Sequence, residues 1–404
     1  MHVMRKRNYF FSAAILAAFV ASLFAMPDLW PLQIRSNQAL AQREVDTCAG
    51  VRGEKQKELC YEKNIPRLMD KGLPMERVFE IVAAVQSVDV EYQSCHVLAH
   101  FITAKEVQRD PSRWKGVVAR SPVGICGNGA IHGAFQERFR ESSFPDAPIS
   151  TIVDMLAGVC DSRDGWNPIK LQQSSCVHGV GHLLLFVTDA NVKKSIAACD
   201  EIKSLADRDL RQSCYEGVFM QLYQPLEDED KALIYAIEDE AKQTKSFCAQ
   251  FGGDAHSACV KESWAAIPGS ASTPDGFEAL CKQLGNREEV EYCAIGLMFP
   301  VIEELHYDIP TVKKFCNDLS DQGLQRICWA RTAVKLIWAD WRNVSRSLSV
   351  CRDAPEEFKD SCWTELAIFA HNGFSPDSPQ LKELCSGMPS PWRDSCASKT
   401  YTIL

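Results

Sequence analysis

Five of the nine histidines in this 404-residue chain fall between residues 96 and 182, in the segments CHVLAHF, CGNGAIHGAF and CVHGVGHLLLF. His96 and His100 are four residues apart, as are His178 and His182, and His132 stands between the two pairs. Residues at positions i and i+4 share one face of an α-helix. Their imidazole nitrogens can therefore converge on one ion at about 2 Å from each nitrogen. This spacing predicts a transition-metal site.

The cysteines give these histidines a common register. His132 and His182 each lie six residues after a cysteine, and at the same place later segments carry apolar residues: Met220, Ala265, Phe299, Val334 and Ile368. An otherwise apolar position indicates the interior, so we expect His132 and His182 to be buried neighbours. Glu216, two residues after its cysteine, projects toward the same zone. It is the predicted carboxylate ligand, and Glu137 is a further candidate.

Glycines are concentrated around the histidines. Glycine three residues after a cysteine recurs and indicates close helix packing, at Gly129, Gly179, Gly217 and Gly296. Gly127, Gly133 and Gly181 are additional and occur only in the histidine segments. Each glycine costs about 1 kcal/mol in a helix interior relative to alanine. We interpret the additional glycines as keeping room for something beside the histidines.

The donor set indicates which metals to expect. If the cysteines form disulfides, the donors are imidazoles and the candidate carboxylates, a set that suits copper, iron, nickel or zinc better than magnesium or calcium. Five or six ligands exceed the needs of one tetrahedral zinc and favour one octahedral ion or a dinuclear centre. We expect copper or iron first and zinc next. The chain has no CxxCH motif for c-type haem, and GNGAIHG does not follow a predicted strand, so a nucleotide is not expected.

Other interpretations of the histidines are a hydrogen-bonded structural network and a pH-sensing cluster. The isolated His256, His306 and His371 are interpreted as hydrogen-bonded core residues. Two HxxxH pairs with a fifth histidine in register are harder to satisfy by mutual hydrogen bonds alone, which favours metal.

The elements that position these residues are indicated by 18 cysteines, no two closer than 11 residues. In an exported chain such cysteines predict disulfides between neighbours in the sequence. The expected pairs are Cys48 and Cys60, Cys95 and Cys126, Cys160 and Cys176, Cys199 and Cys214, Cys248 and Cys259, Cys281 and Cys293, Cys316 and Cys328, Cys351 and Cys362, and Cys385 and Cys396.

The spacing of these pairs predicts the fold. From Cys248 onward the first cysteine of each pair recurs at intervals of 33, 35, 35 and 34 residues, the period of helix–turn–helix repeats. We expect an all-α array of disulfide-stapled αα-hairpins, either an α-solenoid or a compact helical superdomain. In architecture this resembles tetratricopeptide and Sel1-like repeats. The Trp-x2-Leu-Gly-x2-Tyr signature is missing, so no family is assigned.

The two ends of the chain differ in composition. Arg5, Lys6 and Arg7 precede an apolar run at residues 9–26, so residues 1–41 are predicted to be a signal peptide or an uncleaved membrane anchor. Irregular histidine-bearing repeats are expected over 42–225 and regular stapled repeats over 226–404. The body is then periplasmic or extracellular. The net charge of −9, without a basic face, argues against a nucleic-acid partner.

These features predict an exported helical metalloprotein with one or two ions, and a redox or hydrolytic metalloenzyme is the first interpretation. The alternative is a stapled solenoid scaffold that binds a protein partner on its C-terminal repeats, with a structural metal or none. Metal storage or delivery is a third. HExxH, P-loop and GxSxG motifs are absent from the sequence.

Overall fold

The structure is a computed structural model, and it describes residues 35–398 apart from these segments: 93–94, 123, 141–143, 145, 164, 203–208, 226–227, 236, 238–240, 242, 267–270 and 284. The described residues are helical, and β-structure among them is limited to the isolated bridges Ile125–Asp340 and Arg163–Trp166. The predicted all-α class is confirmed. The apolar run of the predicted signal, residues 9–26, lies outside the described residues.

The described residues belong to two compact units, one up to Tyr92 and the other from Gln93 onward. The first consists of α2 (Asn37–Cys48), α3 (Glu54–Asn64), α4 (Arg67–Asp70) and α5 (Met75–Val88). α2 packs on α5, and the apolar face of α5 is fully buried. No helix in the described part of the chain is long and apolar enough to cross a bilayer.

The second unit holds the histidines. In chain order its helices are α6 (His96–Arg109), η3 (Pro111–Arg113), α7 (Trp114–Arg120), η4 (Cys126–Asn128), α8 (Gly129–Phe139), α9 (Ile149–Leu156), α10 (Lys170–Val187), α11 (Val192–Glu201), α12 (Arg211–Tyr223), α13 (Asp228–Ile234), α15 (Thr244–Cys248), α16 (Gly253–Glu262), η5 (Ser263–Ala266), α17 (Pro274–Lys282), α18 (Arg287–Glu304), α19 (Ile309–Asp318), α20 (Gln322–Ala339), η6 (Trp341–Asn343), α21 (Val344–Asp353), α22 (Glu356–Gly373), α23 (Pro379–Ser386) and α24 (Trp392–Ala397).

All 18 cysteines form disulfides, and the nine bonds join the predicted neighbours. From α11 to α22 each bond ties a shorter helix to the longer helix that follows, as between α17 and α18 or between α21 and α22. The last bond joins α23 to the shorter α24. In eight of the bonds the two cysteines are separated by 11 to 16 residues in the sequence, and in Cys95–Cys126 by 31. So many intramolecular disulfides indicate an oxidising compartment, periplasmic or extracellular.

Side-chain caps set several helix starts. Thr273 caps α17 as its sequence context predicts, because its side chain accepts a hydrogen bond from the Gly276 amide at 3.2 Å. For α23 the helical pattern DSPQLKELC predicts Asp377 as the N-cap, which is wrong by one residue. Ser378 caps α23 instead, accepting from the Leu381 amide, and Pro379 then occupies the first helical position, where its missing N–H is no loss.

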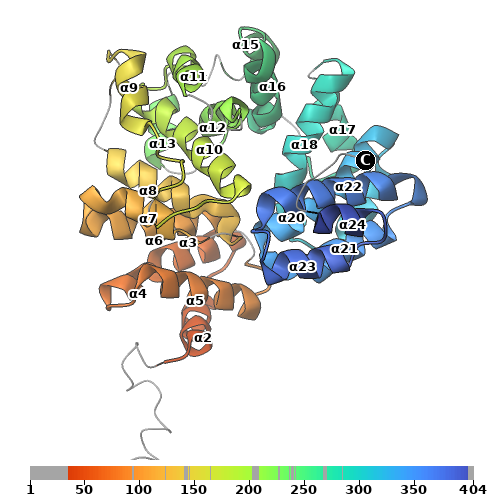
Figure 1. Ribbon diagram of the computed structural model, residues 1–404, viewed down its shortest axis with the longest axis horizontal. Helices are drawn as coiled ribbons and strands as arrows, with labels where there is room; N and C mark the ends of the chain where they lie inside the picture. The colour runs from red at the N-terminus through yellow and green to blue at the C-terminus, as the bar shows by residue number, and fades with distance from the viewer. Residues whose placement is uncertain are drawn as a thin grey trace, which may run out of the picture. The chain divides into compact units, whose positions relative to one another are not determined.

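The long helices pack in the order in which they occur along the chain. α6 packs on α8, α8 on α10, α10 on α12, and the contacts continue through α16, α18, α20, α22 and α24 (Figure 1). The succession of helices also folds back on itself, since α10 packs on α22 and η4 packs on α20. At this return contact the Trp341 amide donates to the Gly124 carbonyl. The predicted division at residues 225–226 falls between α12 and α16, which pack together.

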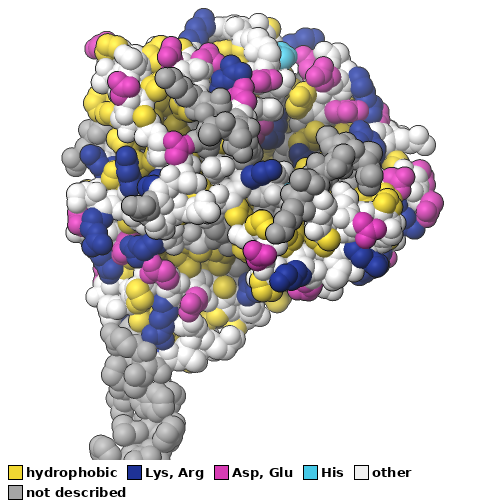
Figure 2. Space-filling view, viewed as in Figure 1, with side chains coloured by type: hydrophobic (Ala, Val, Ile, Leu, Met, Phe, Trp, Pro, Cys, Tyr) yellow, Lys and Arg dark blue, Asp and Glu magenta, His cyan; other side chains and the backbone are white. Residues whose placement is uncertain are grey.

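Charged side chains are mixed over the surface. Figure 2 shows Lys and Arg interspersed with Asp and Glu on the visible face. Many of these charges form exposed ion pairs within or between helices, such as Arg287 with Asp321 at 2.7 Å. Such pairs contribute little stability each, so we attribute the stability of the packed helices chiefly to apolar burial and the disulfides.

Removing a staple far from the histidines should cost stability but not metal. The double variant Cys351→Ser, Cys362→Ser removes a disulfide whose cysteines are 11 residues apart in the sequence. We expect its free energy of unfolding to be lower than that of the wild type by about 3 kcal/mol. Denaturant unfolding and metal analysis of one preparation measure both quantities. The matched variant Cys95→Ser, Cys126→Ser lies beside His96 and should lower both. Equal metal loss in the two variants would contradict this.

Candidate metal centre

The five predicted histidines come together inside the second unit. His96 and His100 extend from α6, His132 from α8, and His178 and His182 from α10. The centroid of the His132 ring lies 5.2 Å from that of His96 and 5.6 Å from that of His100. It lies 5.5 Å from the His178 centroid and 4.9 Å from the His182 centroid. His132 therefore connects the two HxxxH pairs, and its neighbour is His182, as the register predicts.

Three of these residues form a compact group of ligand atoms. One ring nitrogen from each of His96, His100 and His132 lies within 4.8 Å of the others. His100 and His132 are each only 6% exposed. Nitrogens bound to one tetrahedral ion are about 3.3 Å apart, so this group needs to contract by roughly an ångström or more to hold an ion. Rotation of the imidazole rings can provide that movement.

The second pair is already close. His178 Nε2 and His182 Nε2 lie 3.1 Å apart, near the separation of two ligands on one ion. His178 Nε2 also lies 3.4 Å from the sulfur of Met220 on α12. The two rings are tilted by 60° with centroids 4.9 Å apart. The two ring nitrogens thus converge, as the i, i+4 spacing predicts.

Two glutamines orient the outer histidines. His182 Nδ1–H donates to Gln221 Oε1 at 2.6 Å, and His100 forms a hydrogen bond with the Gln136 side chain. A carbonyl that accepts from one ring nitrogen fixes the tautomer and leaves the other nitrogen with its lone pair, as histidine ligands of metals require. Both glutamines are absent from the predicted ligand set. Gln221 is 7% exposed, and a buried glutamine beside histidines is a structural signal that spacing does not provide.

Burial keeps the imidazoles neutral. It lowers the pKa of His96 to about 3 and the pKa values of His100 and His182 to about 4, from an ordinary value of 6.5. It holds the pKa values of His132 and His178 well below 6.5, and repulsion from neighbouring histidines adds to the effect. Neutral imidazole is the form that binds a metal, so the cluster is in its ligating state at neutral pH.

Some of these buried nitrogens make no hydrogen bond. Both ring nitrogens of His132 and the Nε2 atom of His96 are inaccessible to solvent and lack a hydrogen-bond partner. Buried polar atoms are normally satisfied, and an unsatisfied group costs about 1–3 kcal/mol. A self-satisfied hydrogen-bond network does not leave its central member unbonded. This observation favours a bound cation.

Comparison of the chain with protein-family models, curated proteins and solved structures gives no match. What can be said of function therefore comes from the chemistry of this cluster and its surroundings.

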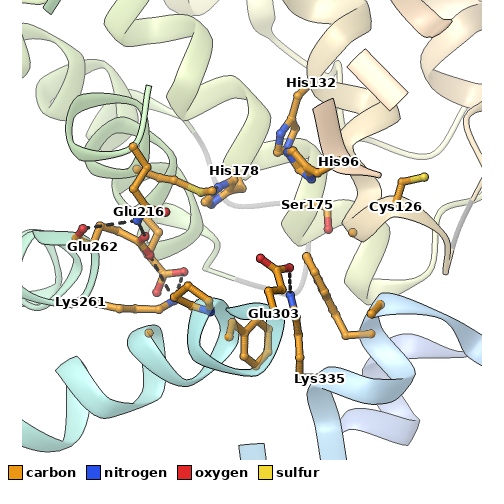
Figure 3. Close-up of a pocket in the computed structure, with 18 of the residues that line it drawn as sticks. His96, Cys126, His132, Ser175, His178, Glu216, Lys261, Glu262, Glu303 and Lys335 are labelled. Carbon is orange, nitrogen blue, oxygen red and sulfur yellow. Dashed lines mark hydrogen bonds and ion pairs between the residues drawn. The ribbon is translucent and has the colours of Figure 1, made fainter. Parts of the chain in front are cut away.

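The cluster borders a central cavity of about 390 Å³. His96, His132 and His178, one from each of three consecutive long helices, line one side of it (Figure 3). The other side carries half-buried ion pairs, Lys261 with Glu216 at 2.6 Å and Lys335 with Glu303 at 2.6 Å. This volume is in the range of cavities that bind small organic molecules.

A second, smaller cavity lies on the other side of the cluster. It measures about 20 Å³, and His100, His132 and His182 line it together with Gln136, Gln221 and Asp230. This volume is sufficient for about one water molecule. The run EDEDK at residues 227–231 is predicted to be a solvated helix start, which is wrong for Asp230. Asp230 is 4% exposed and lies 3.5 Å from Gln136 Nε2.

The predicted carboxylates have other partners. Glu216 does line the central cavity with His178, and its carboxylate pairs with Lys261 Nζ and accepts from Gln212 Nε2 at 3.3 Å. Glu137 pairs with Arg140 at 3.1 Å. Glu216 is therefore placed near the cluster but is held by a lysine, and its role as a ligand remains a prediction.

The additional glycines make room for neighbouring parts of the chain. A Cβ on Gly133 would lie 2.3 Å from the His100 carbonyl oxygen, and one on Gly181 would lie 2.1 Å from that of Cys214. Gly127 has φ +53° and faces the Trp338 ring, with 2.3 Å between a Cβ and the ring. The space beside these glycines is occupied by neighbouring backbone and a tryptophan. The glycines bring the helices close enough for the imidazoles to meet.

The isolated histidines lie elsewhere. His256 contacts the Cys248 carbonyl and Glu289, each at 2.9 Å, and His371 Nε2 lies 3.1 Å from the Ser395 carbonyl oxygen. His306 is exposed at the end of α18, with φ +52°, so its predicted place in the core is wrong. A left-handed residue in a surface turn gives no periodic signal in the sequence.

Proposed function

We propose that this protein is an exported metalloprotein that binds one or two transition-metal ions through His96, His100, His132, His178 and His182. The metal centre faces the central cavity, and its chemistry is redox or hydrolytic. The helical hairpins are a repeat array that holds the centre, and the chain reaches the periplasm or the cell exterior through its N-terminal segment. The C-terminal hairpins are a surface for a protein partner.

The observation that carries the proposal is His132. It is the only one of the five that neighbours both pairs, it is buried, and neither of its ring nitrogens has a hydrogen-bond partner. A cation bound to one or both nitrogens satisfies them. Neutral imidazoles suit copper, iron or zinc, and we rank copper and iron ahead of zinc.

The cavity supports a reactive rather than a sealed centre. An ion held by His96, His132 or His178 can take a water molecule or a substrate on its cavity side, which is the arrangement of catalytic metals. Glu262 lines the same cavity, and burial raises its pKa to about 7 although Lys261 opposes the effect. A carboxyl group with this pKa can exchange a proton near neutral pH.

Metal titration of the purified, untagged chain tests the proposal. We expect the wild type to bind at least about one equivalent of copper, iron or zinc. His132→Leu should bind about one equivalent less, since the group of His96, His100 and His132 then has two ligand atoms in place of three. His306→Asn is the matched control, because it removes an exposed imidazole and asparagine tolerates φ > 0. Its metal content should equal that of the wild type.

The scaffold alternative predicts a different result. If the wild type binds no metal after reconstitution while thermal unfolding shows a folded chain, the histidines form a structural or pH-sensing network and the proposal is wrong. If metal is bound and His132→Leu loses it without unfolding, the scaffold without metal is excluded.

A further inference from the structure

We infer that Met220 is a metal ligand and that His178, His182 and Met220 form a site selective for copper(I), separate from the group of His96, His100 and His132. This rests on the proposed function and specifies it, because it identifies a second site, a thioether donor and an oxidation state. Met220 is not among the ligands that the histidine spacing predicts.

The distances between donors fit one ion. Nitrogen and sulfur ligands of a tetrahedral ion, at about 2.0 and 2.3 Å, lie about 3.5 Å apart, and two nitrogens lie about 3.3 Å apart. The observed separations are 3.4 Å from His178 Nε2 to Met220 Sδ and 3.1 Å from His178 Nε2 to His182 Nε2. His178 Nε2 is therefore already at ligand separation from both His182 Nε2 and Met220 Sδ.

The tautomer of His182 leaves a lone pair that faces His178. His182 Nδ1–H donates to Gln221 Oε1, so Nε2 of the neutral ring carries the lone pair. This Nε2 lies 3.1 Å from His178 Nε2, which also faces Met220 Sδ. When Nδ1 of the neutral His178 ring carries the proton, both Nε2 atoms hold lone pairs that one cation can accept.

The register makes Met220 part of a series. His132, His182 and Met220 each lie six residues after a cysteine, on the consecutive long helices α8, α10 and α12. The next helices have Ala265, Phe299 and Val334 at this position, and none of these can bind a metal. Side chains that can bind a metal therefore occupy this position on three successive long helices, and Met220 on α12 is the last of them.

The donor set selects the metal. Thioether sulfur is a soft ligand that favours copper(I), and imidazole also binds copper, whereas a site for zinc or iron gains little from a methionine. Three neutral donors leave a monovalent ion with a single uncompensated charge, which costs less in a dry interior than a divalent ion. Both His178 and Met220 line the central cavity, so the copper is reachable from it.

Copper(I) titration with a chromophoric chelator as competitor tests the inference, using Met220→Leu. Leucine has nearly the volume of methionine but no sulfur, so we expect the fold to be kept. The copper(I) affinity should fall at least about tenfold, as changes at ligand shells do, while zinc(II) affinity stays within about twofold. Met298→Leu is the matched control, because Met298 is fully buried on α18 and does not line the cavity.

X-ray absorption of the copper(I) form gives an independent readout. We expect one sulfur at about 2.3 Å in the wild type and in Met298→Leu, and nitrogen ligands alone in Met220→Leu. Copper bound without a sulfur neighbour overturns the inference but leaves the proposed function intact. A chain that binds no copper, zinc or iron at all contradicts the proposed function itself, and the two failures are therefore distinguishable.

Discussion

Acidification from pH 7 to pH 4 is expected to unfold the metal-free protein. Its buried histidines have folded-state pKa values far below 6.5, so the unfolded chain binds more protons once the pH falls below 6.5. The contribution of these histidines to the free energy of unfolding is fully present above pH 6.5. It is lost as the pH falls from 6.5 toward the folded-state pKa values, about 4 for His100 and His182 and about 3 for His96. Burial, the first cause in each case, favours the neutral ring.

The expected loss is large. A fall in pKa from 6.5 to about 4 corresponds to about 3 kcal/mol for each of His100 and His182, and His96 contributes more. Together these approach the whole stability of an ordinary domain, about 5–15 kcal/mol. Urea unfolding at a series of pH values measures this dependence directly.

Two comparisons make the acid prediction specific. His182→Gln cannot take up a proton, so it should lose about 3 kcal/mol less than the wild type between pH 7 and pH 4. Bound metal competes with protons for the same nitrogens, so the loaded protein should unfold at a lower pH. A stability that is constant from pH 7 to pH 5 would show that the rings are not buried as described.

Gly217→Ala is expected to separate α10 from α12 and disrupt the second histidine pair. The new Cβ would lie 2.0 Å from the His178 carbonyl oxygen and 3.1 Å from the Gly181 Cα atom. Both are backbone atoms, which cannot rotate away, so the two helices have to move apart. We expect a loss of about 3 kcal/mol, as for severe overpacking, together with weaker metal binding.

Gly116→Ala is the matched control for this substitution. Gly116 lies on the exposed side of α7, and a Cβ there would meet no atom within 4 Å. Alanine should stabilise that helix by up to about 1 kcal/mol. Denaturant unfolding and copper titration of both variants measure the difference. A Gly217→Ala protein as stable as the wild type would contradict the close approach of α10 and α12.

Much of the fold could be predicted from the cysteines. Their spacing and even number indicate neighbour pairing, and helical patterns around them indicate hairpins, because a local disulfide needs two segments in contact. The return contact of α10 with α22 and of η4 with α20 could not be predicted. It depends on how each helix is oriented on the one before it over many helices, and no residue signals that orientation locally.

The site was predicted in part. The i, i+4 spacing and the register identify the five histidines, but not the partners that orient them. Gln136 and Gln221 come from helices whose rotation the sequence does not specify, and Glu216 meets Lys261 because α12 packs on α16. Met220 occupies an apolar position and reads as core. Only the distance to His178 reveals its sulfur as a donor.

The short reach of the disulfides bears on how the chain can be oxidised during export. Each cysteine pairs with its neighbour in the sequence, so a chain that emerges N-terminus first presents the two partners of each bond before the first cysteine of the next. Every bond can then close in order of emergence, with no thiol waiting for a distant partner. Such a chain should need an oxidant for thiols but little disulfide isomerase.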